Sequence, residues 1–326
     1  MTAGRRRWAG ALFAAAGVLL LPACGPGPAA PDGEPSTTAP SGTPSVPAPP
    51  APDPAPTDLT AVVAADLAEL ETAYDARVGV YAVDTATGDL VEHRADERFA
   101  YASTIKALAA GFVLRGRSVE VLDEPVPVTT DDVSGAGWSP ATESRVGTDA
   151  TVRELGAAAV SESDNGAFNA LLRRLGGPEA LQAALVDLGD TTTLVDAWEP
   201  ELNRFTPGEP ARTSTPRALA DGLAAFALGD ELEPGVREEY VGWLTGSTTG
   251  DGTVRAGAPD GWVVGSKTGT AGRHGSRNDV AVVWPPDGAP IVLAVLTDRV
   301  APDAEPDDAL LADVARTVLG AYADQG

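Results

Sequence analysis

The amino-acid sequence predicts an α/β fold of the α+β type. We expect a five-stranded antiparallel sheet, flanked by an N-terminal and a C-terminal helix and joined to a mostly helical subdomain. Strand-like runs occur near the two ends of the folded part, whereas residues from about 103 to 246 have the pattern of helices and loops. The two groups of strands can form one sheet by pairing across this insertion. We therefore expect the functional site in the cleft between the two parts.

The N-terminal residues 1–24 have the layout of an export signal. Arginines 5–7 precede an apolar run from Trp8 to Leu21, which is short for a membrane span. Cys24, the only cysteine, follows at the position of a bacterial lipoprotein cleavage site. Either Cys24 carries a lipid anchor or ordinary signal cleavage leaves the chain without one. The chain is expected at the outer face of the cytoplasmic membrane, or as a secreted or periplasmic protein.

Residues 25–57 consist mainly of proline, alanine, glycine, serine and threonine. This composition cannot bury a core and favours an extended linker. We expect the catalytic domain over residues 58–326, with its sheet part at about 58–100 and 250–326 and its helical part at about 101–249.

The first predicted elements are a helix and a hairpin. The helix opens at Asp58, and its apolar face is formed by Leu59, Val63, Leu67, Leu70 and Tyr74. Residues 77–94, RVGVYAVDTATGDLVEHR, predict a β-hairpin that turns at Thr87 and Gly88.

Three strand-like runs follow near the C-terminus, at residues 261–270, 278–285 and 289–300. Their connections are too short to hold a crossover helix, so the strands must pair antiparallel. The last predicted helix runs from about Asp308 to Asp324. It is expected to bury Leu311, Val314, Val318 and Tyr322.

Acidic residues outnumber basic ones by 47 to 23, which gives a formal charge of −24. Such a chain repels phosphate backbones and anionic headgroups, so we expect no nucleic-acid partner and no membrane contact beyond an anchor at Cys24. One cysteine and two histidines are too few for a zinc site, and we expect no metal and no cofactor. A monomer is the default expectation.

Lys106 and Lys267 are the only lysines among these 23 basic residues. Arginine cannot give up its proton under working conditions, whereas a desolvated amine can, so a lysine indicates a position where a proton is exchanged or a compact charge is needed. In STIK, Ser103 and Lys106 lie three residues apart at a helix start and therefore on one face. This spacing suits an activated serine nucleophile.

Two more motifs carry chemistry-bearing side chains. Ser163, Asp164 and Asn165 form S-D-N between two apolar helical runs, and Lys267 opens K-T-G on a predicted strand. Together with S-x-x-K, this order and context are those of class A β-lactamases and penicillin-binding proteins. The sequence from residue 58 to 326 resembles this superfamily of serine enzymes.

The loop from about Thr191 to Thr215 is unusually long and contains DAWEPELNRF. Glu199 and Asn203 in it resemble the E-x-x-L-N motif of class A β-lactamases, and we name this segment the glutamate loop. Penicillin-binding enzymes generally lack this glutamate. Its carboxylate can activate a water molecule that hydrolyses the acyl-enzyme. The resemblance implies hydrolysis of penicillins and cephalosporins, whereas a misplaced Glu199 would indicate a D-alanyl-D-alanine peptidase or a non-hydrolysing β-lactam sensor.

The resemblance implies five catalytic residues. Ser103 attacks the lactam carbonyl, and either Lys106 or Glu199 takes its proton. Ser163 passes a proton to the leaving nitrogen, and Lys267 helps to receive the substrate's carboxylate.

It also implies a set of binding residues. Thr268, Gly269 and Arg277 belong to the carboxylate site, and the amide N–H groups of Ser103 and Thr270 form the oxyanion hole. Three asparagines complete the set: Asn165 for the substrate's side-chain amide, Asn203 for the hydrolytic water and Asn169 as support for the glutamate loop. Trp138 matches an aromatic residue at the mouth of the cleft, although a tryptophan can also serve as plain core.

One position pair departs from the family pattern. Many members close the neck of the glutamate loop with an arginine before the Trp-Glu step and an aspartate near the loop's end. This chain has Ala197 and Arg212 there, so neither charge is left unpaired. Arg212 is expected to pair with Asp196 or Glu209 instead.

Overall fold

The computed structural model describes residues 56–325, all of them within one unit, Asp53–Gly326. The predicted export signal with Cys24, and the predicted linker up to residue 55, lie outside the described residues. Within residues 56–325, no helix combines the length and apolar character needed to cross a membrane.

The helices are α1 Thr60–Tyr74, α2 Ile105–Leu114, α3 Thr130–Val133, α4 Val152–Ser161, α5 Asn165–Leu175, α6 Pro178–Leu188, α7 Pro216–Ala227, α8 Pro234–Thr245, α9 Val254–Gly257 and α10 Asp308–Ala323. Single 3₁₀ turns are η1 Ala102–Thr104, η2 Val119–Asp123, η3 Glu143–Arg145 and η4 Glu201–Asn203. The strands are β1 Arg77–Asp84, β2 Leu90–His93, β3 Phe99–Ala100, β4 Pro125–Pro127, β5 Asp149–Thr151, β6 Thr213–Ser214, β7 Val263–Thr270, β8 Arg277–Trp284 and β9 Ile291–Asp298.

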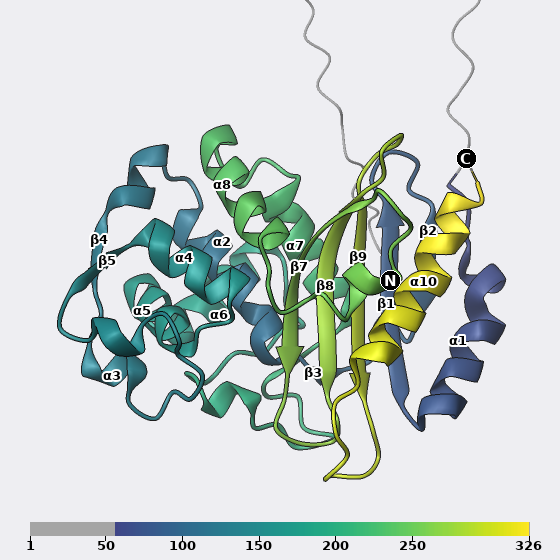
Figure 1. The fold of residues 1–326 in the computed structure, drawn as a ribbon, viewed down its shortest axis with the longest axis horizontal. Coiled ribbons are helices and arrows are strands. Elements are labelled where there is room, and N and C mark those ends of the chain that lie inside the picture. The colour runs from purple at the N-terminus through teal and green to yellow at the C-terminus, as the bar shows by residue number, and fades with distance from the viewer. Residues whose placement is uncertain (1–55, 326) are drawn as a thin grey trace, which may run out of the picture. The chain divides into compact units, whose positions relative to one another are not determined.

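The predicted five-stranded antiparallel sheet is confirmed, with the strand order β2-β1-β9-β8-β7. The N-terminal hairpin joins the C-terminal strands through β1 and β9, which pair from Arg77 opposite Asp298 to Asp84 opposite Ile291. In Figure 1, α1 and α10 cover one face of this sheet, and the helical part lies on its other side. Strand β7, which carries Lys267, is an edge strand of the sheet.

Both faces of the central strands are buried, which explains their continuous apolar sequences. Alternate residues of β9 belong to two different cores. Ile291, Leu293 and Val295 pack with α1 and α10, whereas Val292, Ala294 and Leu296 pack with the helical part. The C-terminal helix buries Leu311, Val314, Val318 and Tyr322, as its apolar periodicity predicts.

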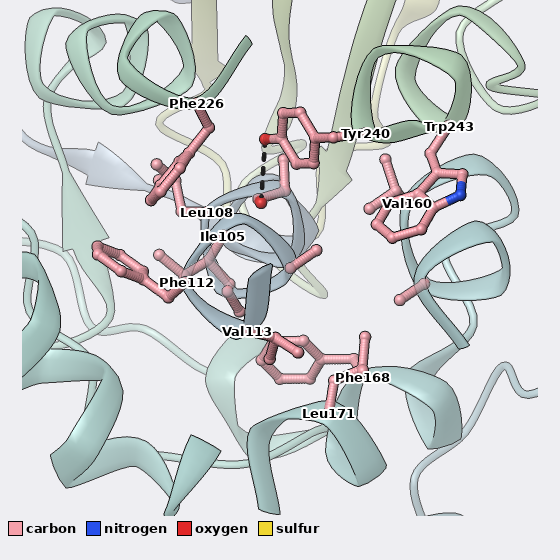
Figure 2. Packing of buried hydrophobic residues seen from close by; sticks show 14 of the residues in the cluster. Ile105, Leu108, Phe112, Val113, Val160, Phe168, Leu171, Phe226, Tyr240 and Trp243 are labelled. Atoms are coloured by element: carbon pink, nitrogen blue, oxygen red, sulfur yellow. Dashed lines mark hydrogen bonds between the residues drawn. The ribbon is translucent and has the colours of Figure 1, made fainter. Parts of the chain in front are cut away.

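Helix α2 lies at the centre of the helical part, and all ten of its residues are buried. Figure 2 shows side chains from the surrounding helices, among them Phe168, Phe226, Tyr240 and Trp243, packed around it. The Tyr240 hydroxyl donates a hydrogen bond to the carbonyl of Ala107 at 3.1 Å. A Cβ atom at Gly111 would lie 2.5 Å from the Phe226 ring, so only glycine fits there. The small residues of this helix let its neighbours approach closely.

Two details differ from the sequence-based expectation. Helix α1 begins at Thr60, because the Asp58 side chain accepts a hydrogen bond from the Thr60 amide while Asp58 itself bridges to Leu90. The helical part also contains two small two-stranded sheets, β3 with β6 and β4 with β5. Strands of two or three residues are too short to show an alternating pattern. The β3–β6 pair ties the end of the glutamate loop to the residues just before Ser103.

Candidate active site

Ser103 lies in the 3₁₀ turn η1, directly before the buried helix α2. Ala102 before it adopts a left-handed backbone conformation, with φ at +48°, which is uncommon for a residue with a side chain. Asn278 of β8 donates to the carbonyl of Ala100 at 2.8 Å and holds this segment against the sheet. The Ser103 hydroxyl donates to Glu199 Oε1 at 3.4 Å.

The Lys106 side chain is completely buried, one turn further along α2. Its Nζ atom lies 3.0 Å from Glu199 Oε1 and donates to Asn165 Oδ1 at 2.5 Å and to the Ser163 carbonyl at 2.8 Å. Burial lowers the pKa of the Lys106 amine, and the Glu199 carboxylate partly opposes this effect. Within residues 56–325 no hydrogen bond joins Lys106 directly to Ser103; Glu199 contacts both.

Ser163 lies between α4 and α5, in a left-handed conformation with φ at +60°. Its hydroxyl accepts a hydrogen bond from Lys267 Nζ at 2.9 Å and lies 3.5 Å from Lys106 Nζ. Burial, followed by the nearby charge of Lys106, lowers the pKa of the Lys267 amine. The site thus brings both lysines of the chain to the same serine hydroxyl.

The glutamate loop places the Glu199 carboxylate inside the protein, where the residue is only 5% exposed. Asn203 donates to Glu199 Oε2 at 2.6 Å. The Asn169 side chain accepts from the Glu199 amide at 3.0 Å and donates to its carbonyl at 3.2 Å. Asn169 also donates to the carbonyl of Asp132 at 3.0 Å. Side-chain amides therefore fix both the backbone and the carboxylate of Glu199.

Strand β7 runs closely past the segment that carries Ser103. A Cβ atom at Gly269 would lie 2.8 Å from the carbonyl of Tyr101, so glycine is required for this approach. Arg277, opposite Thr270 in the sheet, donates to the Thr270 hydroxyl at 3.0 Å and to Asp308 Oδ1 at 2.5 Å. The predicted carboxylate site therefore gathers on one end of β7 and β8.

Asn165 and Trp138 lie at the other side of the site. The Asn165 side chain accepts from Lys106 and donates to the carbonyl of Ala136 at 2.6 Å, and the residue is 9% exposed. Trp138 is 65% exposed, so its alternative interpretation as core is wrong. The Trp138 indole donates to the carbonyl of Glu162 at 3.0 Å, which fixes the ring at the surface near Asn165.

Two further residues of the site have no predicted role. Asp164, fully buried, caps α5 and accepts from the Ala141 amide and the Thr142 hydroxyl, which holds the segment around Trp138. Its place in the S-D-N motif marks Asp164 in the sequence. Its role could not be predicted, because the segment that it holds, at Ala141 and Thr142, lies more than 20 residues away. Thr249 shares a hydrogen bond of 2.7 Å with the Thr268 hydroxyl, and no motif marked it.

Neither another cavity nor a cluster of metal-binding side chains offers an alternative site among residues 56–325 that includes the predicted site residues. A cavity of about 760 Å³ lies beside the second half of the glutamate loop, lined in part by Arg98, Phe205 and His274, and none of the predicted site residues lines it. Among residues 56–325, His, Cys, Asp and Glu side chains form no group of three that could bind a metal ion.

Comparison with known proteins agrees with this geometry. A sequence model described as the β-lactamase enzyme family matches residues 62–322. The chain belongs to the β-lactamase enzyme family.

Individual relatives identify the class. A β-lactamase of Amycolatopsis lactamdurans is 51% identical over 271 residues, which cover 83% of this chain and 89% of the relative. A β-lactamase of Bacillus licheniformis is 47% identical over 256 residues, covering 78% and 82%. The class A β-lactamase of Clostridium kluyveri superimposes with a TM-score of 0.76 at 42% identity, covering 79% of this chain and 98% of that one. The predicted resemblance to class A β-lactamases is confirmed.

The neck of the glutamate loop is closed by Arg212, in a way that differs from the pattern of many family members. The Arg212 Nε atom donates to Asp196 Oδ1 at 2.8 Å, so Asp196 is its partner rather than Glu209. Its Nη1 atom donates to the carbonyls of Glu201 and Arg204, at 3.1 and 2.9 Å. One guanidinium thus links the two limbs of the loop and the turn that follows Glu199.

We predict that Arg212→Ala loosens the glutamate loop and slows deacylation. Loss of one charged and two carbonyl hydrogen bonds should lower the free energy of unfolding by about 1–2 kcal/mol. Urea unfolding and the decay rate of the acyl-enzyme measure the two effects. Arg204→Ala is the control, since this exposed arginine pairs with Glu201 of the same loop and with no other side chain among residues 56–325. Wild-type stability and deacylation in Arg212→Ala would contradict this role of the neck.

Proposed function

We propose that this β-lactamase opens penicillins and cephalosporins through an acyl-enzyme on Ser103, and that Glu199 drives hydrolysis of that ester. One observation carries the proposal: the buried Glu199 carboxylate lies within hydrogen-bond reach of Ser103 and is fixed by Asn203 and Asn169. A misplaced glutamate, which the peptidase and sensor alternatives require, does not fit these contacts.

Acylation begins when Ser103 Oγ bonds to the lactam carbonyl carbon. Its proton passes to Lys106 or Glu199, whose Nζ and Oε1 atoms lie 3.0 Å apart. Burial lowers the pKa of the Lys106 amine, so this amine releases a proton more readily than an exposed lysine does. The backbone N–H groups of Ser103 and Thr270 stabilise the negative charge that develops on the carbonyl oxygen.

The lactam C–N bond breaks as its nitrogen gains a proton. Ser163 suits this transfer, since its hydroxyl accepts from Lys267 and lies near Lys106. The proton that left Ser103 can thus be passed on, through the lysines and the Ser163 hydroxyl, to the ring nitrogen. The product of this step is the ester between Ser103 and the opened lactam.

Deacylation needs a water molecule aimed at the ester carbonyl. Glu199 takes a proton from this water as the new C–O bond forms, and the Ser103 oxygen leaves with a proton. Asn203 holds the carboxylate in a single orientation, which favours one water position. Lys267, Thr268 and Arg277 bind the carboxylate that the substrate carries, while Asn165 and Trp138 lie where its side chain extends.

We also propose export, with residues 1–24 as the signal and Cys24 as the lipid-bearing residue behind a linker at 25–57. The basic start, the apolar run and the single cysteine support this proposal.

We expect Cys24→Ser to move the protein from the membrane fraction to the soluble fraction, because the variant cannot be lipidated. Expression of the full chain in a bacterium that modifies lipoproteins, followed by fractionation and activity assay, measures this. If the wild-type protein is already in the soluble fraction, Cys24 is not lipidated, and the protein is exported by ordinary signal cleavage.

We predict that Glu199→Gln accumulates a covalent adduct and loses turnover by about 10³-fold, because the amide cannot accept a proton from water. Nitrocefin hydrolysis and intact mass after exposure to benzylpenicillin measure the two quantities. Glu201→Gln, which changes an exposed carboxylate of the same loop, should behave as wild type. A stable adduct on the wild-type chain would instead indicate a peptidase or a sensor.

We predict that Lys106→Arg slows acylation by at least about 100-fold, although the positive charge is kept, because a guanidinium cannot exchange its proton. Rapid-quench intact mass with benzylpenicillin gives the acylation rate, and circular dichroism checks the fold. Lys106→Ala provides a second test, since ethylamine should restore part of its activity and guanidine should not. Acylation of Lys106→Arg at the wild-type rate would exclude proton transfer through Lys106.

A further inference from the structure

Asp279 is a completely buried carboxylate that none of these steps uses. It lies on β8 opposite Thr268 of β7, so the two side chains share one face of the sheet. Lys267, next in sequence to Thr268, points to the opposite face, toward Ser163. Asp279 therefore lies on the face of the sheet that carries Thr268, opposite to the face of Lys267.

Only one oxygen of this carboxylate is well satisfied. Asp279 Oδ2 accepts from the Thr253 hydroxyl at 2.6 Å and from the Val254 amide at 3.2 Å. Among residues 56–325, Asp279 Oδ1 accepts no hydrogen bond of good geometry; the Ser266 hydroxyl lies close enough to favour the ionised carboxylate but is not aligned with it. A charge buried in this way is costly, so a purely structural anchor would be better served by a neutral side chain.

The contacts of Asp279 lead to the carboxylate site through residues 249–254. The Thr253 amide donates to the carbonyl of Gly250 at 3.2 Å, which closes a tight turn directly after Thr249. Thr249 shares a hydrogen bond of 2.7 Å with Thr268, and its carbonyl accepts from Arg277 at 3.3 Å. The segment held by Asp279 thus touches both a hydroxyl and a cation of this site.

The charge of Asp279 also acts on the two nearest cations of the predicted carboxylate site, Lys267 and Arg277. Its negative charge favours the protonated form of Lys267, against burial and the charges of Lys106 and Arg277. Burial raises the pKa of the Asp279 carboxyl, while its hydrogen bonds and the charge of Arg277 oppose this and favour the ionised form. Glu199 and Asp308 are the other carboxylates near these cations, and both are engaged, with Lys106 and Arg277 respectively.

We infer that Asp279 is a positioning residue for the substrate's carboxylate. Its charge stabilises the cation of Lys267 on the opposite face of the sheet and that of Arg277 on its own face. Its hold on Thr253 fixes Thr249 against Thr268 and Arg277. This inference rests on the proposed function and names a determinant of its specificity for anionic substrates.

The test compares benzylpenicillin, which has the carboxylate, with its methyl ester, which lacks it. Asp279→Asn keeps the shape and the acceptor for Thr253 but removes the charge. We expect it to raise KM for benzylpenicillin about tenfold, which corresponds to 1.4 kcal/mol, with kcat nearly unchanged. For the methyl ester, kcat/KM should change less than about twofold.

Thr253→Val removes the anchoring hydroxyl and leaves the charge, and it should shift KM in the same direction by a smaller factor. It also keeps the inference testable if Asp279→Asn does not fold. Asp251→Asn, an exposed carboxylate in the same segment, should match the wild type.

An equal loss of kcat/KM for both substrates in the folded variants would overturn the inference and leave Asp279 as a structural residue. Unchanged KM for benzylpenicillin in both variants would overturn it as well. Failure of the proposed function looks different, because the wild-type protein itself would then hydrolyse neither substrate.

Discussion

The buried contact between Lys106 and Glu199 is the constraint on which the rest of the structure depends. Removing an amine and a carboxylate from water is costly, and the loss is recovered only when hydrogen bonds surround both groups. The chain meets this condition with four partners from two segments. Ser163 and Asn165 bind the amine and Asn169 the glutamate, all at or just before α5, and Asn203 of the glutamate loop binds the carboxylate. The packed helices around α2 hold these segments in register, so the hydrophobic core supports the chemistry directly (Figure 2).

Much of this arrangement could be predicted from the sequence. The sheet could be predicted because strands buried on both faces are continuous apolar runs. The catalytic candidates could be predicted because their motifs are local in the sequence; they are Ser103, Lys106, Glu199 and Lys267. Contacts between distant segments could not be predicted. Nothing near Thr249 indicates that it meets Thr268, and Asp279 resembles any polar residue at the end of a strand. These roles arise from the register of β7 and β8, which the linear sequence does not specify.

The glutamate loop shows how one requirement can be met by different residues. A long loop with little regular structure needs a crosslink at its neck if a catalytic carboxylate is to stay in place. Here the cation, Arg212, lies on the C-terminal part of the loop, and its partner Asp196 lies on the N-terminal part. Because Arg212 also binds two carbonyls of the intervening turn, its guanidinium acts on the backbone as well as on a charge.

The burial of both lysines has a consequence for the protein's own chemical durability. β-Lactams acylate exposed lysine amines without any enzyme, so a protein that works amid such compounds is exposed to slow covalent damage. Lys106 and Lys267 are the only lysine amines in the chain, and both are completely buried. Its remaining basic side chains besides histidine are arginines, whose protonated guanidinium is a poor nucleophile. The protein therefore has no exposed lysine amine that its own substrates could acylate.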